Sequence, residues 1–378
     1  MSQSWVEIDL GALEHNIKVL SARVGDRVRV APVVKSNAYG HGLELAAPAF
    51  VRAGARWLCV HSFREATRLR ALELGAEILI LGPLSPEENV PAVAAGFHCT
   101  TATRGQILAL AAAAKKLNSK ARLHLKIETG THRQGVVTGE LDAVAALLRG
   151  DPHLELAGVH SHFANVEDTT RHEFAQEQLR RYREAVDGLR AAGLGGFLRH
   201  MASSAAAILF DETHFDLLRP GIAAYGHWPS RETFVSAKER QIKGLDLRPA
   251  LSWKVPVAQI QQVEAGEHVG YGCSHRLEVD SRVAVLSVGY ADGYRRDLGG
   301  RAYVRIGGRR CPVVGRICMN LMMVDVTHVP EAKEGDTAVL LAPDADGGPS
   351  AETVAEWAGS ISYEILASIR PELPRRGA

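Results

Sequence analysis

Polar side chains follow several apolar runs at the point where each run ends. Lys35 comes directly after the apolar run 28–34 (VRVAPVV) and before the segment SNAYGHG. If that run is a strand of a parallel barrel, Lys35 lies at its carboxyl end, where barrel enzymes carry their active sites. Burial there lowers the pKa of a lysine and leaves a nucleophilic amine, as Schiff-base chemistry requires. The alternative is a long side chain that reaches solvent and has no chemical role.

Two further runs end in groups of basic residues and histidines. The groups are Lys126, Glu128, His132 and Arg133 around the end of run 122–128, and His160 and His162 around the end of run 154–161. The two histidines are two residues apart and therefore share one face of their strand. A His/Glu metal site is the alternative interpretation. No third ligand stands at a suitable spacing, so we predict no metal.

The last two runs of the series carry the residue types of a phosphate site. Ser203 and Ser204 precede a short helical run, and Arg219, Gly221 and Ile222 lie in the run 217–226. The loops after the seventh and eighth strands of a barrel, with a helix N-terminus, form its usual phosphate site. Taken singly, each is an ordinary helix cap or turn glycine. Together they indicate one phosphate beside one reactive lysine, which favours pyridoxal 5'-phosphate as cofactor.

An eight-stranded barrel would position these side chains. Apolar runs alternate with amphipathic helical patterns up to residue 226, as expected for parallel strands covered by helices. We therefore predict an α/β fold whose N-terminal part is a (β/α)8 barrel of the TIM type. The expected strands are 28–34, 57–62, 77–82, 97–103, 122–128, 154–161, 197–203 and 217–226. Asp9 is placed to cap the first helix, and Ser85 with Pro86 begins another.

The pattern changes after residue 226. A polar segment, 226–249, is interpreted as a linker, and strand-like runs separated by turn residues follow it, which indicates antiparallel β structure. Ser350 is placed to cap one late helix. We place the barrel in residues 1–234 and a β-rich domain in residues 235–378. Tyr271, between two glycines of the second domain, is either a hairpin tip or a base whose pKa must be lowered.

Charge and apolar-run length exclude several classes of partner. Lys+Arg is 44 and Asp+Glu is 43, so the net charge is +1, and no basic run predicts nucleic-acid binding. The apolar runs are shorter than the roughly 20 residues that span a bilayer, so no membrane association is expected. The N-terminus resembles no signal peptide, and the 5 cysteines form no CxxC pair. We expect a cytoplasmic protein with reduced thiols.

The same residues carry a resemblance to a known family. The segments VVKSNAYGHG, KIETGTHRQGV, GVHSHFA, SSAA, RPGIAAYG, GYG, GYADGY, GRICMN and SYEI occur in an order, along essentially the whole chain, that resembles alanine racemase. The resemblance implies a barrel followed by a β-rich domain. It also implies an amino-acid racemase, an isomerase that uses pyridoxal phosphate to interconvert L-alanine and D-alanine and supplies D-alanine for bacterial peptidoglycan. The family is homodimeric with shared active sites.

The resemblance also implies a role for individual residues. Lys35 resembles the lysine that carries the cofactor and acts as one base, and Tyr271 of the partner subunit resembles the opposing base. His162 and Arg219 resemble the network between cofactor ring and tyrosine, and Arg133 resembles the residue that contacts the substrate carboxylate. Met319 matches a backbone contact to substrate, and Lys126 a lysine that is often carbamylated. The phosphate-binding set corresponds to Tyr39, Ser204, Gly221, Ile222 and Tyr363.

Several positions depart from the family pattern. They are Glu128, Thr131, His132, Ser203, Gly270 and Asn320. Some of them line the substrate side of the expected site, and Gly270 in particular leaves room for a larger substrate side chain. A broader-specificity amino-acid racemase, acting on serine or other side chains, is therefore the alternative function. A pyridoxal-phosphate decarboxylase on the same barrel would need a Gly-rich phosphate loop, which the sequence lacks.

Overall fold

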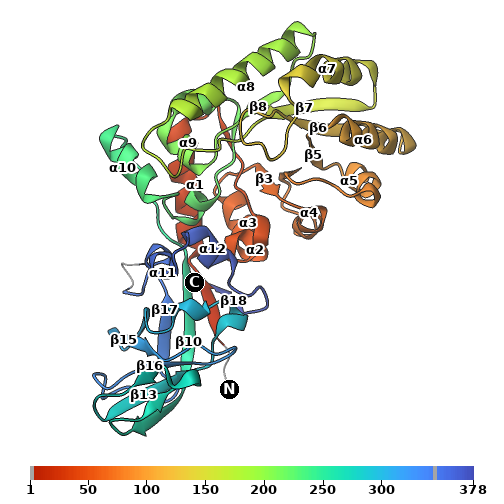
Figure 1. The fold of residues 1–378 in the computed structure, drawn as a ribbon. Coiled ribbons are helices and arrows are strands. Elements are labelled where there is room, and N and C mark those ends of the chain that lie inside the picture. Colours follow the sequence, from red (N-terminus) through yellow and green to blue (C-terminus); the bar gives the residue numbers. More distant parts are fainter. Residues whose placement is uncertain (1–3, 344–346) are drawn as a thin grey trace. The chain divides into compact units, whose positions relative to one another are not determined.

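The computed structural model describes residues 4–343 and 347–378. The chain divides into two compact units (Figure 1). The first, here called the barrel unit, comprises Glu14–Lys35 and Ala47–Leu247. The second, here called the sheet unit, comprises the chain up to Leu13, Ser36–Ala46 and Arg248–Ala378. The two units are therefore built from interleaved stretches of sequence.

Parallel strands form the centre of the barrel unit. Six of them, β3 to β8, form one parallel sheet in sequence order, and β2 and β9 form a second parallel pair. The strands are β2 (Arg29–Val30), β3 (Trp57–Val60), β4 (Glu77–Ile80), β5 (His98–Thr101), β6 (Ala121–Lys126), β7 (Leu154–His160), β8 (Leu198–His200) and β9 (Leu217–Leu218). Each overlaps a run that the sequence predicts to be a strand, and only β6 begins outside its run, one residue earlier at Ala121.

Backbone hydrogen bonds join the pair to both edges of the six-stranded sheet. The Val34 N–H donates to the carbonyl of Cys59 at 2.7 Å, which links the segment after β2 to β3. The Arg219 N–H donates to the carbonyl of Ala202 at 3.1 Å, which links the segments after β9 and β8. The eight strands thus follow one another around a ring, and the barrel prediction is confirmed.

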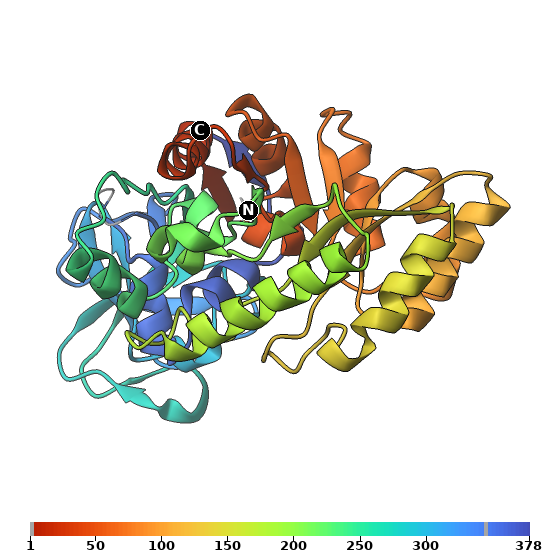
Figure 2. The same ribbon diagram turned by 90° about the horizontal axis from the view of Figure 1, so that it is seen from above.

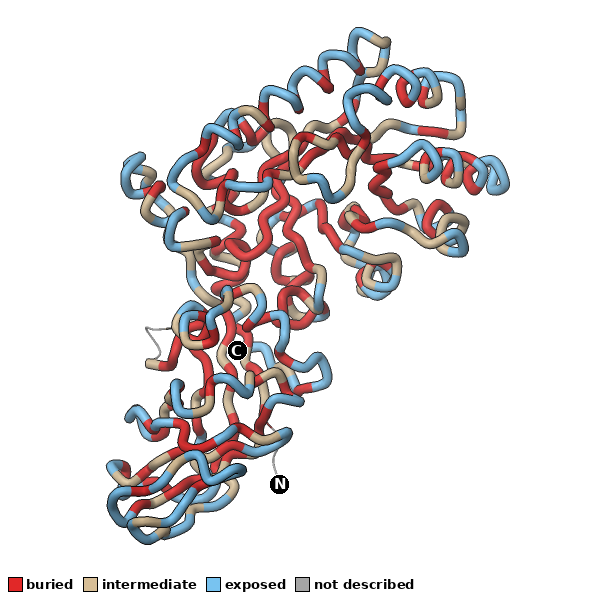
Figure 3. Tube along the Cα trace, viewed as in Figure 1, coloured by how far each residue is buried: buried red, intermediate tan, exposed pale blue. Residues whose placement is uncertain are grey.

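Helices cover the outer side of these strands (Figures 1 and 2). The helices are α1 (Leu10–Val24), α3 (Leu43–Arg52), α4 (Phe63–Arg70), α5 (Asn89–Ala94), α6 (Arg104–Lys116), α7 (Leu141–Gly150), α8 (Glu173–Ala191), α9 (Ser204–Leu209) and α10 (Arg231–Glu239), with short 3-10 turns η1 (Pro86–Glu88), η2 (Thr138–Glu140), η3 (Asp211–Thr213) and η4 (Ile222–Tyr225). The predicted caps are present, since Asp9 Oδ1 accepts the Ala12 N–H at 2.8 Å and Glu88 accepts the Ser85 N–H at 2.9 Å. Figure 3 shows the strands buried and the outer helix faces exposed.

One expectation for this unit is wrong. The polar segment that we interpret as a linker contains helix α10, which begins after its N-cap Ser230. The Ser230 hydroxyl accepts the Thr233 N–H at 2.9 Å, and Thr233, Ser236 and Ala237 are buried. A capping serine and a short buried stripe therefore make a helix in a segment whose polar composition alone suggests none.

A mostly antiparallel sheet of eight strands forms the centre of the sheet unit. Its order is β13-β16-β15-β14-β17-β10-β1-β18, with β13 also pairing with β10. The strands are β1 (Trp5–Ile8), β10 (Leu251–Val263), β11 (His268–Val269), β12 (His275–Arg276), β13 (Ser281–Leu286), β14 (Tyr303–Ile306), β15 (Arg309–Val314), β16 (Met322–Asp325), β17 (Thr337–Leu341) and β18 (Arg375–Gly377). The other elements are η5 (Tyr271–Cys273), η6 (Tyr290–Asp292), η7 (Arg296–Leu298), α11 (Ala351–Ala358) and α12 (Ser362–Ala367). The predicted β-rich character of this part is confirmed.

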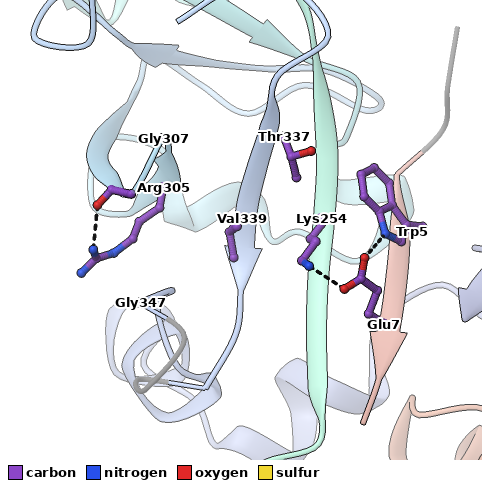
Figure 4. Close-up of a pocket in the computed structure, with 9 residues that line it drawn as sticks. Trp5, Glu7, Lys254, Arg305, Gly307, Thr337, Val339 and Gly347 are labelled. Carbon is purple, nitrogen blue, oxygen red and sulfur yellow. Dashed lines mark hydrogen bonds and ion pairs between the residues drawn. The ribbon is translucent and has the colours of Figure 1, made fainter. Parts of the chain in front are cut away.

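The N-terminal strand β1 belongs to this sheet, which the sequence did not lead us to expect. It pairs antiparallel with β10 and parallel with β18. Figure 4 shows how its side chains support the pairing: Glu7 accepts hydrogen bonds from the Trp5 indole at 2.8 Å and from Lys254 at 2.5 Å. These residues line a hollow of ≈ 350 Å³ that contains none of the predicted site residues.

No helix in the described part of the chain is long and apolar enough to cross a lipid bilayer.

Candidate active site

Lys35 follows β2 and begins a left-handed turn, α2 (Lys35–Tyr39). Four consecutive residues, Ser36 to Tyr39, have φ between 52° and 54°. This conformation costs roughly 1–2 kcal/mol for each residue that is not glycine. The Asn37 side chain compensates in part, because its Oδ1 accepts the Leu43 N–H at 3.1 Å. Strain of this kind concentrates at functional sites, where it fixes a neighbouring side chain.

Four cationic or imidazole side chains lie near Lys35 in the barrel unit: Lys126, Arg133, His162 and Arg219. Burial, and then the charge of Arg133, lower the pKa of Lys35. Burial and the charges of Arg219 and Arg133 hold the pKa of His162 at about 3. Burial and the same two arginines lower the pKa of Lys126 to about 8. Such a concentration of like charge is costly unless an anion occupies the space between these groups.

Arg219 is the most buried of these groups, at 5% exposed. Its Nη2 donates to the carbonyls of Ser161 at 2.8 Å and Met201 at 3.4 Å, and its Nη1 donates to Nδ1 of His200. Within residues 4–343 and 347–378, no carboxylate forms an ion pair with it. Desolvation therefore lowers the pKa of this guanidinium. A buried cation that is held only by neutral acceptors is suited to orient a polar ligand atom.

Hydrogen bonds to one hydroxyl, that of Ser204, join the loops that follow β8 and β9. Ser204 Oγ accepts the N–H of Gly221 at 3.0 Å and the N–H of Ala223 at 3.2 Å. Ser204 is the first residue of α9, and Ile222 is the first residue of η4. The first N–H groups of a helix have no intrahelical acceptor. Two sets of such donors, joined by a buried serine, make the phosphate cradle that the sequence predicts at this barrel end.

The loop after β6 is ordered by Glu128. Burial raises the pKa of this carboxyl, but backbone N–H groups of Gly130, His132 and Thr131 outweigh burial and lower it. His132 adopts a φ of 49°, which lets the chain turn around the carboxylate. Arg133 follows at once, exposed to solvent. The glutamate that departs from the family pattern therefore anchors the loop that carries Arg133.

These donors fit pyridoxal phosphate. The cofactor needs an amine that is readily neutral, an anion cradle for its phosphate and a partner for its ring nitrogen. Lys35, the Ser204–Gly221 cradle and the buried Arg219 have these three chemistries within one unit. In the described part of the chain, no cluster of three or more His, Cys, Asp or Glu side chains is arranged to hold a metal ion.

The remaining predicted site residues lie in the sheet unit. Tyr271 is 71% exposed at η5 and Met319 is 56% exposed. Tyr39 and Tyr363 lie together, with ring centroids 6.0 Å apart. Part of the predicted site thus belongs to each unit, and the sheet unit presents its tyrosine base candidate to solvent.

Gly270, before Tyr271, has a local reason to be glycine. Its φ is +77°, a region that side-chain-bearing residues rarely adopt. A Cβ there would also lie 2.8 Å from Met323 Cε. The turn that presents Tyr271 therefore accounts for this glycine without any need for a larger substrate.

Sequence reasoning missed several residues around Arg219 and Lys35. His200 contacts Arg219, and Ser161 accepts from it through its carbonyl. Glu65 raises the pKa of Lys35 in opposition to burial. The signal for His200 was present, because it ends strand β8 at the same barrel end as His160 ends β7.

The arrangement defines a class of protein, a barrel enzyme with its polar site at the carboxyl ends of the strands. Comparison with known proteins shows which family within this class the chain matches. Residues 8–229 match the family model "Alanine racemase, N-terminal domain" and residues 250–377 match "Alanine racemase, C-terminal domain". The alanine racemase of Syntrophobacter fumaroxidans is 39% identical over 369 residues, which cover 98% of this chain and 96% of that protein.

Solved structures agree with this result. The alanine racemase from D-cycloserine-producing Streptomyces lavendulae superposes with a TM-score of 0.92 and 34% identity, covering 100% of this chain and 97% of the other. The Bacillus anthracis alanine racemase with bound L-Ala-P gives 0.91 and 32%, covering 100% and 95%. The chain belongs to the alanine racemase family, whose members are pyridoxal-phosphate-dependent isomerases.

Proposed function

We propose that the protein interconverts L-alanine and D-alanine by a two-base mechanism, with Lys35 on one face of the substrate and Tyr271 of the partner subunit on the other. The observation that carries this proposal is the convergence of Lys35, the buried Arg219 and the Ser204–Gly221 cradle at one barrel end. When bound, pyridoxal phosphate acidifies the α-carbon of the attached amino acid by delocalising its negative charge.

Lys35 supplies a base that is readily neutral. Burial and the charge of Arg133 lower the pKa of its ammonium group, so Nζ accepts a proton at a lower pH than a surface lysine does. Racemisation needs one base to remove the α-proton and the conjugate acid of a second base to return a proton to the opposite face. We assign the second role to the phenol oxygen of the partner subunit's Tyr271.

Arg219, His162 and the phosphate cradle hold and tune the cofactor. Arg219 would hold the ring nitrogen of the bound cofactor by donating to it and would leave that nitrogen without a proton, because a guanidinium does not release its own. His162 stays a neutral imidazole, with its pKa at about 3, and can relay a hydrogen bond toward the tyrosine. Ser204, Gly221, Ile222, Tyr39 and Tyr363 bind the phosphate.

Arg133 and Met319 bind the substrate, and Lys126 orients Arg133. At a pKa of about 8, a tenth or so of Lys126 is a free amine at neutral pH. That amine adds to CO2 and loses a proton to give a carbamate. The new anion sits among the cations that surround Lys126 and pairs with Arg133, which presents its remaining donors to the substrate carboxylate.

A homodimer completes each site. Tyr271, Met319 and Ile361 are large apolar side chains that stay more than half exposed in the single chain. Exposed apolar groups of this size are typical of surfaces that bind another protein. A C2 dimer would cover them and bring the partner subunit's Tyr271 to Lys35.

Activity and shared sites can be tested with two variants. The holoenzyme should racemise L-alanine, measured by chiral chromatography, and Lys35→Ala and Tyr271→Phe should each lose racemisation. Co-expression of the two variants yields hybrid dimers in which one site has both wild-type residues. Random pairing predicts recovery of about a quarter of wild-type activity. No recovery from demonstrated hybrid dimers would exclude shared sites.

A biosynthetic role is the final part of the proposal. One similar structure, at 33% identity and TM-score 0.84, is described as the biosynthetic alanine racemase from Pseudomonas aeruginosa. We propose that this protein likewise supplies D-alanine for cell-wall synthesis. Expression in a bacterial strain that lacks alanine racemase should restore growth without added D-alanine, and the Lys35→Ala variant should not.

A further inference from the structure

A chain of side-chain hydrogen bonds leads away from Arg219 through the barrel interior. Nδ1 of His200 accepts from Arg219, His200 Nε2 lies 2.7 Å from His124 Nδ1, and His124 Nε2 lies 3.0 Å from His98 Nδ1. His98 Nε2 then lies 3.5 Å from an Oε2 of Glu77. We call these five residues the histidine relay.

The relay spans the barrel from one end of the strands to the other. Glu77 and His98 are the first residues of β4 and β5, whereas His200 is the last residue of β8 and Arg219 follows β9. Glu77 and His98 line a hollow of ≈ 670 Å³ at the amino ends of the strands. Parallel strands share one direction, so the relay connects this hollow to the end that carries the site.

The hydrogen-bond chemistry of arginine fixes the direction of every link. A guanidinium only donates, so His200 must accept at Nδ1 and, as a neutral imidazole, carries its proton on Nε2. His200 then donates to His124, which donates from its own Nε2 to His98. His98 donates in turn to a carboxylate, which only accepts. Each link is thus satisfied by a single tautomer at every histidine.

The barrel is built to accommodate this arrangement. Gly158 on β7 faces His124, and a Cβ at that glycine would lie 2.3 Å from His124 Nδ1. Trp57 packs against His98 with ring centroids 4.6 Å apart. Burial lowers the pKa of His98 to about 4 and holds the pKa values of His124 and His200 well below the ordinary range, so the imidazoles stay neutral.

We propose that Glu77, His98 and His124 are positioning residues for the guanidinium at the far end of this relay. This inference rests on the proposed contact between Arg219 and the cofactor ring. No carboxylate among the described residues pairs with Arg219, so the direction and strength of the His200 acceptor determine where Nη1 points. The relay carries no proton to the site, because arginine cannot pass one on.

The protonation pattern gives a test that does not depend on activity. In neutron diffraction from crystals of the deuterated holoenzyme, His98, His124 and His200 should each carry one deuteron, on Nε2. A deuteron on Nδ1 of any of the three, or on both nitrogens, would overturn the proposal. If the enzyme fails to racemise alanine, the proposed function falls while this measurement still decides the relay.

The kinetics of Glu77 variants, at the end of the relay that reaches the hollow, test whether the relay affects catalysis. Glu77→Leu removes the terminal acceptor and should lower kcat about tenfold while KM changes by less than about twofold, because orientation of a group that acts in the chemical step is lost. Glu77→Gln keeps an acceptor oxygen and should restore most of the rate. Equal rates for Glu77→Leu and wild type would refute the positioning role.

Two matched controls separate the relay from its surroundings. Glu155→Leu changes a second exposed carboxylate of the same hollow and should leave kcat unchanged. Arg122→Leu removes the ion pair that Arg122 makes at 3.4 Å with Oε2 of Glu77, but it keeps Glu77 as the acceptor for His98, and it should also leave kcat unchanged. If kcat of either control variant falls as far as kcat of Glu77→Leu, the effect comes from a general disturbance of the hollow, and the proposal is refuted.

Discussion

Replacing Gly158 by alanine should destabilise the barrel through one atom. The added Cβ would lie 2.3 Å from Nδ1 of His124. That ring cannot move freely, because it is hydrogen-bonded to His98 at 3.0 Å and to His200 at 2.7 Å. Gly158 does not have a positive φ, so the backbone itself accepts alanine. The variant therefore tests only the space that the glycine leaves for the imidazole.

The expected size of the effect follows from three contributions. Overpacking a close-packed core costs roughly 1–3 kcal/mol. Breaking one buried hydrogen bond adds about 1 kcal/mol. Replacing a strand glycine by alanine returns roughly 0.5–1 kcal/mol through lower chain entropy in the unfolded state. The net loss in free energy of unfolding is about 2 kcal/mol, which lowers the Tm of a domain of this size by roughly 4–8 °C.

Calorimetry of the holoenzyme measures this change. The matched control is Gly188→Ala on α8, where a Cβ meets nothing within 4 Å, and its Tm should equal or exceed that of wild type. The double variant Gly158→Ala with His124→Ala should lose less stability than the sum of the two single variants, since the clash is gone. A Gly158→Ala protein as stable as wild type would refute the packing argument.

Three other predictions follow from the site and its surroundings. Burial lowers the pKa of His98 from 6.5 to about 4, so the unfolded chain binds this proton first as pH falls. The free energy of unfolding should therefore decrease by at most about 3 kcal/mol between these two pH values, and His98→Gln should flatten that part of the curve measured by denaturant titration. Arg219→Glu should increase transamination by-products, measured as pyruvate released from alanine, because a protonated ring nitrogen strengthens the electron sink; unchanged by-product levels would contradict this. Gly270→Ser should slow alanine racemisation through backbone strain of about 1 kcal/mol but keep the ratio of serine to alanine rates, and a lower ratio would instead favour the broader-specificity alternative.

Most of the barrel could be predicted because its local signals agree. The apolar runs have strand length, the helices between them have capping residues such as Asp9, and several runs end in, or are followed by, polar residues. The same regularity led to Lys35, Arg219 and Ser204, which the structure brings to one barrel end. These predictions depended on which residue types stand at the ends of successive strands, and that can be read from a sequence.

Other features of the fold could not be predicted, because they depend on contacts between residues that are distant in the sequence. Strand β1 is four residues long, and its partners lie 243 or more positions later in the chain. Helix α10 has so polar a sequence that we predicted a linker in its place. The histidine relay was missed for a third reason, because His98 and His124 occupy inward positions that are expected to be apolar, and only the spatial neighbours supply their partners.

The placement of β1 has a consequence for how the polypeptide is made. Val6 pairs with Trp253 on one side and with Arg375 on the other. On the ribosome, Val6 is therefore made 369 positions before Arg375, and β1 lacks this neighbour until that residue has emerged. The nascent barrel can assemble in the meantime, but until β10 and β18 are available β1 is an unprotected edge open to aggregation.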